Sequence, residues 1–321
     1  MQVATLDGPS ALRRADLPDP RPHPRTVAVQ VHSVGCNFAD ILICQGKYQK
    51  RPGPPFAPGA EVAGTVCAVG EGVRGLREGD RVLALLDWGG YASHVVVPAE
   101  RVLPLPDDVP FDEATALGVV YQTSWFALKH RAPLRPGETL LVHAAAGGVG
   151  LAAVQIGAAM DARVLGTAGS EEKRRLVREH GAAEALDYRD PGWIDQVREW
   201  TGGRGVDVVF DPVGGDAFDG STRCIAWEGR IHVIGFASGT IPTMRLNRLL
   251  LKNISVVGLH WGPYLEHDPA LVRRAAEDLF AMYARGEVRP VVSQVRPLEQ
   301  AAAALEELGA RRTVGKIVLR A

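Results

Sequence analysis

The stretch that decides the fold is LLVHAAAGGVG, residues 140–150. Its first five residues have the apolar character of a buried strand, and the helical pattern of residues 149–160 follows them. The turn between the two matches the dinucleotide-binding fingerprint G-x-G-x-x-G, with Ala145 in the place of the first glycine. Because a strand precedes this turn and a helix follows it, the match predicts a Rossmann domain.

Each residue of the turn has an expected role in binding a dinucleotide. Gly147 lets the backbone approach the pyrophosphate, and Gly150 lets the helix pack closely on the strand. The free N–H groups at the start of the helix face the anion. We therefore expect Ala145, Gly147, Gly148, Val149 and Gly150 to bind a coenzyme. A Gly-rich turn without a ligand is the alternative interpretation, whereas the absence of a Gly-Lys-Ser or Gly-Lys-Thr sequence excludes a P-loop nucleotidase.

Strands alternate with segments of helical length from about residue 121 to residue 261. This alternation predicts right-handed βαβ crossovers and one parallel sheet. Six strands fill a doubly wound domain. The expected strands are residues 140–144, 163–167, 184–187, 207–211, 230–235 and 254–259, and the expected helices are residues 149–160, 171–180, 193–201 and 217–227.

The segments on either side of this region have a different texture. Up to about residue 120, short apolar runs are broken by Gly, Pro and Asp, which is typical of an irregular β-rich barrel. The tail after residue 262 returns to strands, at residues 291–295 and 315–319. We therefore expect an α/β protein in which a Rossmann domain, residues 121–261, is inserted in a β-rich domain of residues 1–120 and 262–321.

The end of the second Rossmann strand predicts which coenzyme is used. A carboxylate there would bind the ribose hydroxyls of NAD, but the strand ends in Ala168-Gly169-Ser170. The acids that follow, Glu171 and Glu172, lie in a first helical turn, where the helix dipole alone favours them. Ser170, Lys173 and Arg174 instead offer a hydroxyl and two cations, which suit a 2′-phosphate. NADPH is favoured; the alternative is that Ser170 only caps the helix and the cations form a solvated face.

Composition excludes several classes of partner. The 321 residues carry a formal net charge of −1, and no Lys/Arg run stands out, so neither nucleic acid nor an anionic membrane surface is an expected partner. No segment reaches the ~20 apolar residues of a membrane span, and residues 1–7 lack a signal-peptide pattern. We expect a cytoplasmic protein. Its few, irregularly spaced cysteines indicate free thiols rather than a disulfide framework: Cys36, Cys44, Cys67 and Cys224.

Motifs spread over the whole chain resemble one family. They are GCNFAD at 35–40, PGAEVAG at 58–64, GGYA at 89–92, HAAAGGVG at 143–150 and GKIV at 315–318. Together they resemble the quinone oxidoreductase branch, of the zeta-crystallin type, of the medium-chain dehydrogenase/reductase superfamily. The resemblance implies that the β-rich domain is GroES-like and catalytic.

The same motifs differ from the zinc-dependent alcohol dehydrogenases at the metal ligands. In that branch a cysteine ligand occupies the place of Asn37 and a histidine ligand the place of Ala60. An amide is a poor zinc ligand, a methyl group is none, and no C-x₂-C pair is present for a structural zinc. Cys36 and His32 together would supply only two ligands. The resemblance therefore implies activity without zinc.

The resemblance also assigns coenzyme residues outside the phosphate turn. Lys173 and Tyr188 would contact the 2′-phosphate of NADPH, and Thr123 would bond near the nicotinamide ribose. The residues Gly235, Phe236 and Ala237 would form the loop over the nicotinamide, with Leu259 beside it at the end of the sixth strand. The alternative for Tyr188 is a half-buried aromatic after a strand. The alternative for Thr123 is a residue that only packs its helix.

On the substrate side the resemblance points to Asn37, Asp40 and Tyr48. An amide and a phenol can donate hydrogen bonds to a developing oxyanion, which is the role that zinc would otherwise fill. Asp40 has the alternative of capping a helix, and Tyr48 that of packing as a lid aromatic. The sequence departs from the bacterial pattern at Leu42, where a second tyrosine is common.

The expected reaction is hydride transfer from C4 of the NADPH nicotinamide to a quinone or another conjugated carbonyl acceptor. Without a Lewis acid a plain ketone is polarised weakly, whereas a conjugated acceptor delocalises the incoming charge. An alkenal or enoyl-thioester reductase, which also needs a proton donor, is the nearest alternative. A non-catalytic NADPH-binding protein, like the lens crystallins of this family, is the second.

The sixth strand indicates how the chain assembles. Residues 253–259, NISVVGL, would leave an exposed apolar edge in a monomer, which proteins avoid. In the family that the chain resembles, two such edges pair across a two-fold axis. We therefore expect a homodimer.

Overall fold

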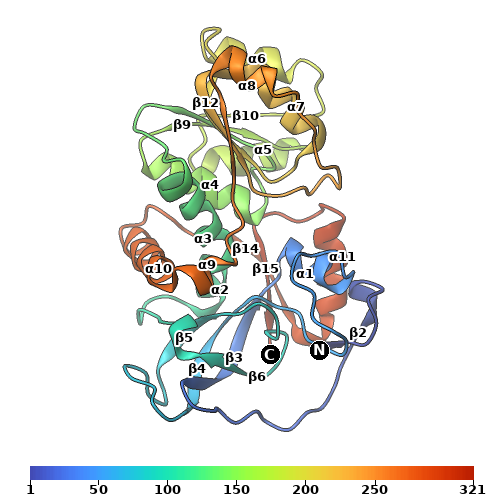
Figure 1. Ribbon diagram of the computed structural model, residues 1–321, viewed down its shortest axis with the longest axis vertical. Coiled ribbons are helices and arrows are strands. Elements are labelled where there is room, and N and C mark those ends of the chain that lie inside the picture. The colour runs from blue at the N-terminus through green and yellow to red at the C-terminus, as the bar shows by residue number, and fades with distance from the viewer. The chain divides into compact units, whose positions relative to one another are not determined.

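The chain forms two compact units, and the computed structural model describes all of residues 1–321 (Figure 1). The first unit comprises Met1–Val119, Gly262–Phe280 and Pro290–Ala321. The second unit comprises Val120–Trp261 and Ala281–Arg289. Each unit is built around a large sheet of its own.

The sheet of the second unit has six strands in the order β10-β9-β8-β11-β12-β13. All neighbouring strands in it run parallel. Counted from β8 as the first strand, the order is 3-2-1-4-5-6, the doubly wound order of a Rossmann fold, so this prediction is confirmed. The strands are β8 Thr139–Val142, β9 Arg163–Thr167, β10 Glu184–Leu186, β11 Val206–Asp211, β12 Ile225–Val233 and β13 Ser255–Gly258.

Helices flank this sheet, and their sequences explain how deeply each is buried (Figure 1). Helix α4 carries small and apolar residues all round, and every residue from Gly150 to Gly157 is buried. Helix α5 has the charged sequence EEKRRLVRE and buries only Val177, as expected of a surface helix. The helices are α3 Val119–Trp125, the π-helical segment η3 Phe126–Arg131, α4 Gly148–Ala159, α5 Glu171–Glu179, α6 Trp193–Trp200, α7 Gly215–Cys224 and α8 Asn247–Lys252.

A buried histidine ties three of these elements together just before the phosphate turn. His143 Nε2 lies 2.7 Å from Ser221 Oγ, and its Nδ1 lies 3.2 Å from Thr167 Oγ1. The Ser221 hydroxyl donates to the carbonyl of Ala217, so it accepts from Nε2–H. Burial lowers the pKa of His143, which keeps the imidazole neutral and leaves Nδ1 to accept from Thr167. His143 therefore has a structural role.

The boundary between α7 and β12 differs from the prediction. The sequence predicted a helix over 217–227 and a strand over 230–235, but α7 ends at Cys224 and β12 begins at Ile225. A register shift interrupts the pairing of β12 with β11, and Glu228 within β12 has a left-handed φ of 59°. This irregularity hides the strand pattern in residues 225–229, so that the helical pattern before it runs on in the sequence.

The sheet of the first unit has seven strands and is mainly antiparallel. Its order is β14-β15-β3-β4-β5-β7, with β6 also paired to β3. Only β14 and β15 run parallel. The predicted β-rich character of this part is therefore confirmed. The strands are β3 Thr26–Gly35, β4 Glu61–Val69, β5 Arg81–Leu85, β6 His94–Pro98, β7 Val102–Pro104, β14 Val292–Pro297 and β15 Lys316–Arg320, and a separate pair is formed by β1 Gln2–Val3 and β2 Leu12–Arg13.

The remaining helices belong to this unit, except that α10 extends from it into Ala281–Ala284 of the second unit, and the last strand lies inside the sheet. Strand β15 pairs antiparallel with β3, which places Val318 opposite Gly35. None of the helices in either unit has the length and apolar character needed to cross a membrane. The remaining helices are η1 Pro9–Ala11, α1 Phe38–Cys44, η2 Ala99–Arg101, α2 Phe111–Leu117, α9 Tyr264–His267, α10 Pro269–Ala284, η4 Leu298–Gln300 and α11 Ala301–Gly309.

One segment groups differently from the expected domain bounds. The sequence placed all of residues 262–321 with the β-rich domain, but Ala281–Arg289 belongs to the second unit. A pair of hydrogen bonds with a buried glutamine on α4 holds the end of this segment. Gln155 donates to the carbonyl of Arg289 at 2.9 Å and accepts from its N–H at 2.7 Å.

Candidate active site

The turn between β8 and α4 has the geometry that a phosphate-binding turn requires. Gly147 is the N-cap of α4, with φ −80° and ψ 170°. A Cβ on Gly150 would lie 2.3 Å from the carbonyl oxygen of Ala144, so helix and turn can pack this closely only because residue 150 is glycine. A Cβ on Gly147 would have no neighbour nearer than 3.4 Å. The N-terminus of α4 is thus open to a ligand beside Gly147 and tightly packed at Gly150.

The residues expected at the 2′-phosphate lie around the start of α5. Ser170 is the N-cap of this helix, and its hydroxyl accepts from the Lys173 N–H at 3.3 Å. Burial lowers the pKa of the Lys173 ammonium group. The exposed ring of Tyr188 lies over Gly169, where an added Cβ would be 3.1 Å from its hydroxyl. Ser170, Lys173 and Tyr188 therefore all lie around the segment that joins β9 to α5.

The second cation expected there is already engaged. Arg174 pairs with Glu171 at 2.9 Å and with Asp187 at 3.1 Å. Its guanidinium also donates to the carbonyl of Ala168 at 3.3 Å. These contacts neutralise Arg174 and leave Lys173 as the better candidate for a phosphate contact.

The remaining coenzyme candidates follow the ends of other strands in the same sheet. Phe236, between Gly235 and Ala237 beyond the end of β12, is partly exposed, and Ala237 N–H donates to the carbonyl of Pro212 at 3.0 Å. Leu259 comes directly after β13 and is buried, whereas Thr123 is half-buried on α3. Because carboxyl ends of parallel strands share one edge, the turn after β8 and the segments after β9, β10, β12 and β13 lie along the edge where such sheets bind ligands.

On the acceptor side, the structure makes Asp40 part of a capping box. Asn37 is the N-cap of α1, and its backbone N–H donates to Asp40 Oδ2 at 2.8 Å. Asp40 Oδ1 accepts from the Gly59 N–H at 3.2 Å, and Oδ2 also accepts from the Tyr91 hydroxyl at 3.2 Å. The carboxyl group is fully buried, which raises its pKa to about 6. The helix-capping alternative thus describes Asp40, whose side chain is 0% exposed, whereas the neighbouring Asn37 keeps 5% of its surface exposed.

The side chain of Asn37 is held by two charged residues that the sequence did not single out. Its Nδ2 donates to Glu61 Oε1 at 2.8 Å, and its Oδ1 accepts from Lys316 Nζ at 2.6 Å. Lys316 also donates to Glu61 Oε1 at 2.5 Å. Both residues lie in the quoted motifs. Their sequence surroundings could have identified them, because Glu61 directly precedes the apolar run Val62-Ala63 and Lys316 directly precedes Ile317-Val318-Leu319. Opposite charges in buried strands pair with each other.

Tyr48 is half-buried and packs against the core of the first unit. Burial raises the pKa of its phenol, and the charges of Asp40 and Asp87 raise it further. The phenol therefore stays protonated at neutral pH and is a hydrogen-bond donor. The packing aromatic and the donor are compatible roles for this side chain.

A metal centre has no obvious ligand set in this structure. No group of three or more His, Cys, Asp and Glu side chains is placed to share a metal ion. All four cysteines are free, and burial raises the pKa of Cys36 and Cys44 to about 12, so both are thiols.

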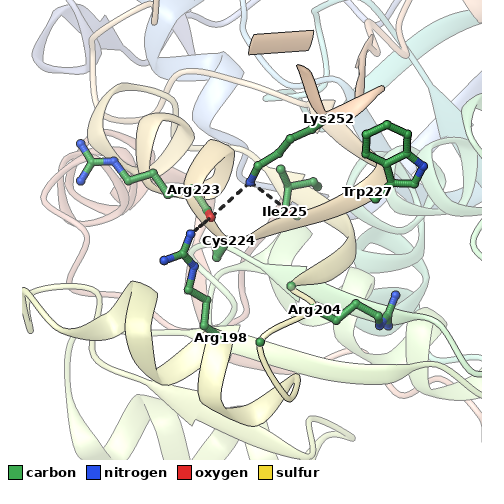
Figure 2. A pocket seen from close by; sticks show the side chains of 9 residues that line it. Arg198, Arg204, Arg223, Cys224, Ile225, Trp227 and Lys252 are labelled. Carbon is green, nitrogen blue, oxygen red and sulfur yellow. Dashed lines mark hydrogen bonds between the residues drawn. The ribbon is translucent and has the colours of Figure 1, made fainter. Parts of the chain in front are cut away.

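Figure 2 shows a cationic cavity of about 340 Å³ in the second unit. Its lining includes residues directly before β11 and at the start of β12, whereas the candidate coenzyme residues follow the ends of strands. Lys252 donates to the carbonyls of Arg223 and Ile225, at 3.4 and 3.3 Å, and Arg198 donates to that of Arg223 at 2.9 Å. These cations satisfy carbonyls at the C-terminal end of α7, as helix ends require. Arg204 is held in an ion pair. The cationic side chains around this cavity therefore serve to cap the C-terminal end of α7. Its lining is Arg198, Gly203, Arg204, Gly205, Arg223, Cys224, Ile225, Trp227 and Lys252.

A Rossmann sheet together with a β-rich, mainly antiparallel unit defines the class of the medium-chain dehydrogenases and reductases. The family model of the alcohol dehydrogenase GroES-like domain matches residues 23–107. The model of the zinc-binding dehydrogenase family matches residues 148–277. The second unit is thus an NAD(P)-type nucleotide-binding domain.

Individual relatives show to which family within this class the chain belongs. The quinone oxidoreductase-like protein 2 homolog of Nematostella vectensis is 43% identical over 296 residues, 91% of this chain and 81% of that protein. The quinone oxidoreductase of Pseudomonas aeruginosa is 38% identical over 321 residues, 99% of this chain and 98% of that protein. The solved structure of Escherichia coli quinone oxidoreductase complexed with NADPH has a TM-score of 0.94 and 31% identity, covering 100% of this chain and 99% of that one. The chain belongs to the quinone oxidoreductase family.

Burial of Asp40 predicts a stability change with pH. Its pKa in the folded protein, about 6, is above the 3.8 of an exposed aspartate, so the folded state holds the proton more tightly. The free energy of unfolding therefore loses this contribution as pH rises from about 4 to about 6, by about 2–3 kcal/mol in all. We expect urea denaturation to show wild type losing this amount relative to Asp40→Asn over that range.

The control is Asp16→Asn, which alters a carboxyl that is 87% exposed. Its free energy of unfolding should follow the wild-type pH dependence. If Asp40→Asn also follows the wild type, Asp40 is ionised in the folded protein at pH 4–6 and the interpretation is wrong.

Proposed function

We propose that this protein is an NADPH-dependent oxidoreductase that passes a hydride to a quinone or another conjugated carbonyl acceptor without zinc. The observation that carries the proposal is the buried contact of Lys316 Nζ with Asn37 Oδ1, at 2.6 Å, where the zinc-dependent branch has a metal ligand. An ammonium ion at this distance uses the oxygen that a metal would need and repels a second cation. Two named quinone oxidoreductases among the relatives support the choice of acceptor.

NADPH supplies the hydride from C4 of its nicotinamide, and the side chains of the first unit act on the acceptor. Asn37 and the protonated phenol of Tyr48 are the proposed donors to the oxygen on which charge develops. Asp40 holds the backbone of Asn37 through the capping box and acts as a positioning residue. A quinone or enone delocalises the charge, so two neutral donors can stabilise it.

Coenzyme choice is proposed to depend on the cluster at the start of α5. Ser170, Lys173 and Tyr188 combine two hydroxyls and a cation, which are suited to a 2′-phosphate. No carboxylate follows β9 before the helix begins, and Glu171 is tied to Arg174. The E. coli relative was solved with NADPH, which agrees with this choice.

Lys173→Ala tests the coenzyme assignment. Loss of a charged hydrogen bond costs about 1.5–3 kcal/mol, so we expect the Kd of NADPH to rise about 10- to 100-fold and that of NADH to change little. Fluorescence titration measures both. Arg175→Ala is the matched control, because Arg175 is on the same helix but its side chain is 70% exposed. An equal rise in Kd for NADPH and NADH would contradict the assignment of Lys173 to the 2′-phosphate.

An acceptor panel tests the reaction itself. With NADPH, 1,4-benzoquinone and 9,10-phenanthrenequinone should be reduced faster than 2-alkenals or crotonyl-CoA, followed by the loss of NADPH absorbance. The rates should survive dialysis against a chelator. Turnover of the thioester alone would replace the proposal by an enoyl-thioester reductase, and tight NADPH binding with no turnover would indicate a non-catalytic protein. Zinc at one equivalent per chain would overturn the metal-free reaction.

We also propose a homodimer that forms through β13, and a cytoplasmic location, which the four free cysteines support. Strand β13 is the last in its sheet and offers an unpaired edge, with Val256 38% exposed on it. The nearby segment 241–251 exposes further large apolar side chains, more than a monomer commonly leaves uncovered. They are Ile241, Leu246, Leu250 and Leu251.

Val256→Glu tests the dimer. We expect light scattering to give the mass of two chains for wild type and of one chain for the variant, because a charge on a pairing edge opposes association. Val295→Glu is the matched control: Val295 is an exposed valine on β14, the edge strand of the other sheet. A wild-type mass of one chain, or dissociation by both variants, would contradict pairing through β13.

A further inference from the structure

Glu61 and Lys316 form a buried ion pair in the first unit. The side chains are 0% and 3% exposed, and Lys316 Nζ lies 2.5 Å from Glu61 Oε1. Glu61 opens β4 and Lys316 opens β15, and neither strand is next to the other in the sheet, because β3 lies between them. The pair therefore spans across the end of β3, next to Asn37.

The glycines beside Glu61 leave just enough room for its side chain. A Cβ on Gly35 would lie 2.3 Å from Glu61 Oε1, and a Cβ on Gly118 would lie 2.2 Å from Oε2. Glu61 Oε2 also accepts from the backbone N–H of Val119, the first residue of α3. Two glycines and one helix start are thus shaped to the carboxylate, as is typical of a group whose position matters.

The pair determines which way the Asn37 amide faces. An ammonium ion can only donate, so the atom 2.6 Å from Lys316 has to be Oδ1. Nδ2 then gives one hydrogen to Glu61 at 2.8 Å, and its remaining contact, with the carbonyl of Gly35, is long at 3.4 Å. The second N–H of Asn37 is consequently the weakly held one, which an oxyanion can compete for.

Lys316 also strengthens that N–H as a donor. Hydrogen bonds in a chain polarise one another, and the effect is larger where water is excluded. Lys316 withdraws electron density through Oδ1, which increases the partial charge on the Nδ2 hydrogens. We infer that Glu61 and Lys316 are positioning residues, which orient and polarise the Asn37 amide so that it can stabilise an oxyanion. This inference rests on the proposed role of Asn37 in reducing the acceptor.

The competing explanation is that the pair serves stability alone. A single substitution cannot separate the two, because it leaves an uncompensated buried charge and destabilises the fold. The double variant Glu61→Gln/Lys316→Met removes both charges and keeps the volumes. Its Tm should recover towards wild type, since replacing both partners of a buried pair is often close to neutral.

We expect the kcat of this double variant with the best quinone to stay reduced by about tenfold or more, because a single oxyanion donor is commonly worth about 10²–10³ in kcat. The Kd of NADPH should stay within about threefold of wild type. Adding the same two substitutions to Asn37→Ala should cause no further loss of kcat, because residues that act through one group are non-additive. A double variant with wild-type kcat, or additive losses on the Asn37→Ala background, would overturn the inference.

An activity-independent readout keeps this inference separate from the proposed function. In wild type the Asn37 side-chain amide should exchange its hydrogens slowly, as followed by NMR of protein labelled on asparagine nitrogen. In the double variant, or in Glu61→Gln/Lys316→Leu if the first double variant does not fold, that exchange should become fast. A wild type that reduces no acceptor but protects this amide would contradict only the proposed function. Unchanged protection in the variant would contradict the inference.

Discussion

A buried carboxylate and a buried ammonium ion each need the other, because an isolated charge is costly in a protein interior. In the first unit this constraint joins Glu61 on β4 to Lys316 on β15, across the end of β3. Lys316 also bonds to Asn37 directly, so the register of the last strand determines one of the contacts that hold the Asn37 side chain. The acceptor site proposed for the first unit thus depends on residues 255 positions apart in the sequence.

The Rossmann sheet was predictable from the sequence because its signals are local. A strand, a glycine turn and a helix within residues 140–160 identify the phosphate turn, and the alternation that follows gives the parallel order. The predicted bounds of elements and domains differ from the structure where the local sequence pattern and the tertiary pairing disagree. Residues 225–227 follow a helical pattern, but Ile225 pairs with β11 just before a register shift. Residues 281–289 belong to the second unit, where Gln155 binds the backbone of Arg289.

The candidate sites were predictable only to the level of residue type. Ser170 and Asp40 suit both a helix cap and a ligand contact, because the same oxygen chemistry serves both. The structure shows both residues capping helices, with different consequences. Ser170 is half-buried at the start of α5 and its second lone pair remains usable, whereas Asp40 is fully enclosed with three donors around it. Glu61 and Lys316 were missed because their meeting depends on strand register, which no short motif encodes.

In the proposed mechanism Lys316 acts on the acceptor only by polarising the Asn37 amide. This restricts the kinds of acceptor that the site can reduce. The ammonium charge is largely balanced by Glu61, so what reaches the acceptor is a polarised amide N–H rather than a full positive charge. Zinc would place a divalent cation directly on the oxygen and would stabilise a localised alkoxide. An amide and a phenol stabilise negative charge on oxygen far less than zinc does. This weaker stabilisation is sufficient only where conjugation has already delocalised the charge. The buried ion pair thus connects the proposed zinc-free reaction to the proposed preference for quinones and enones over simple ketones.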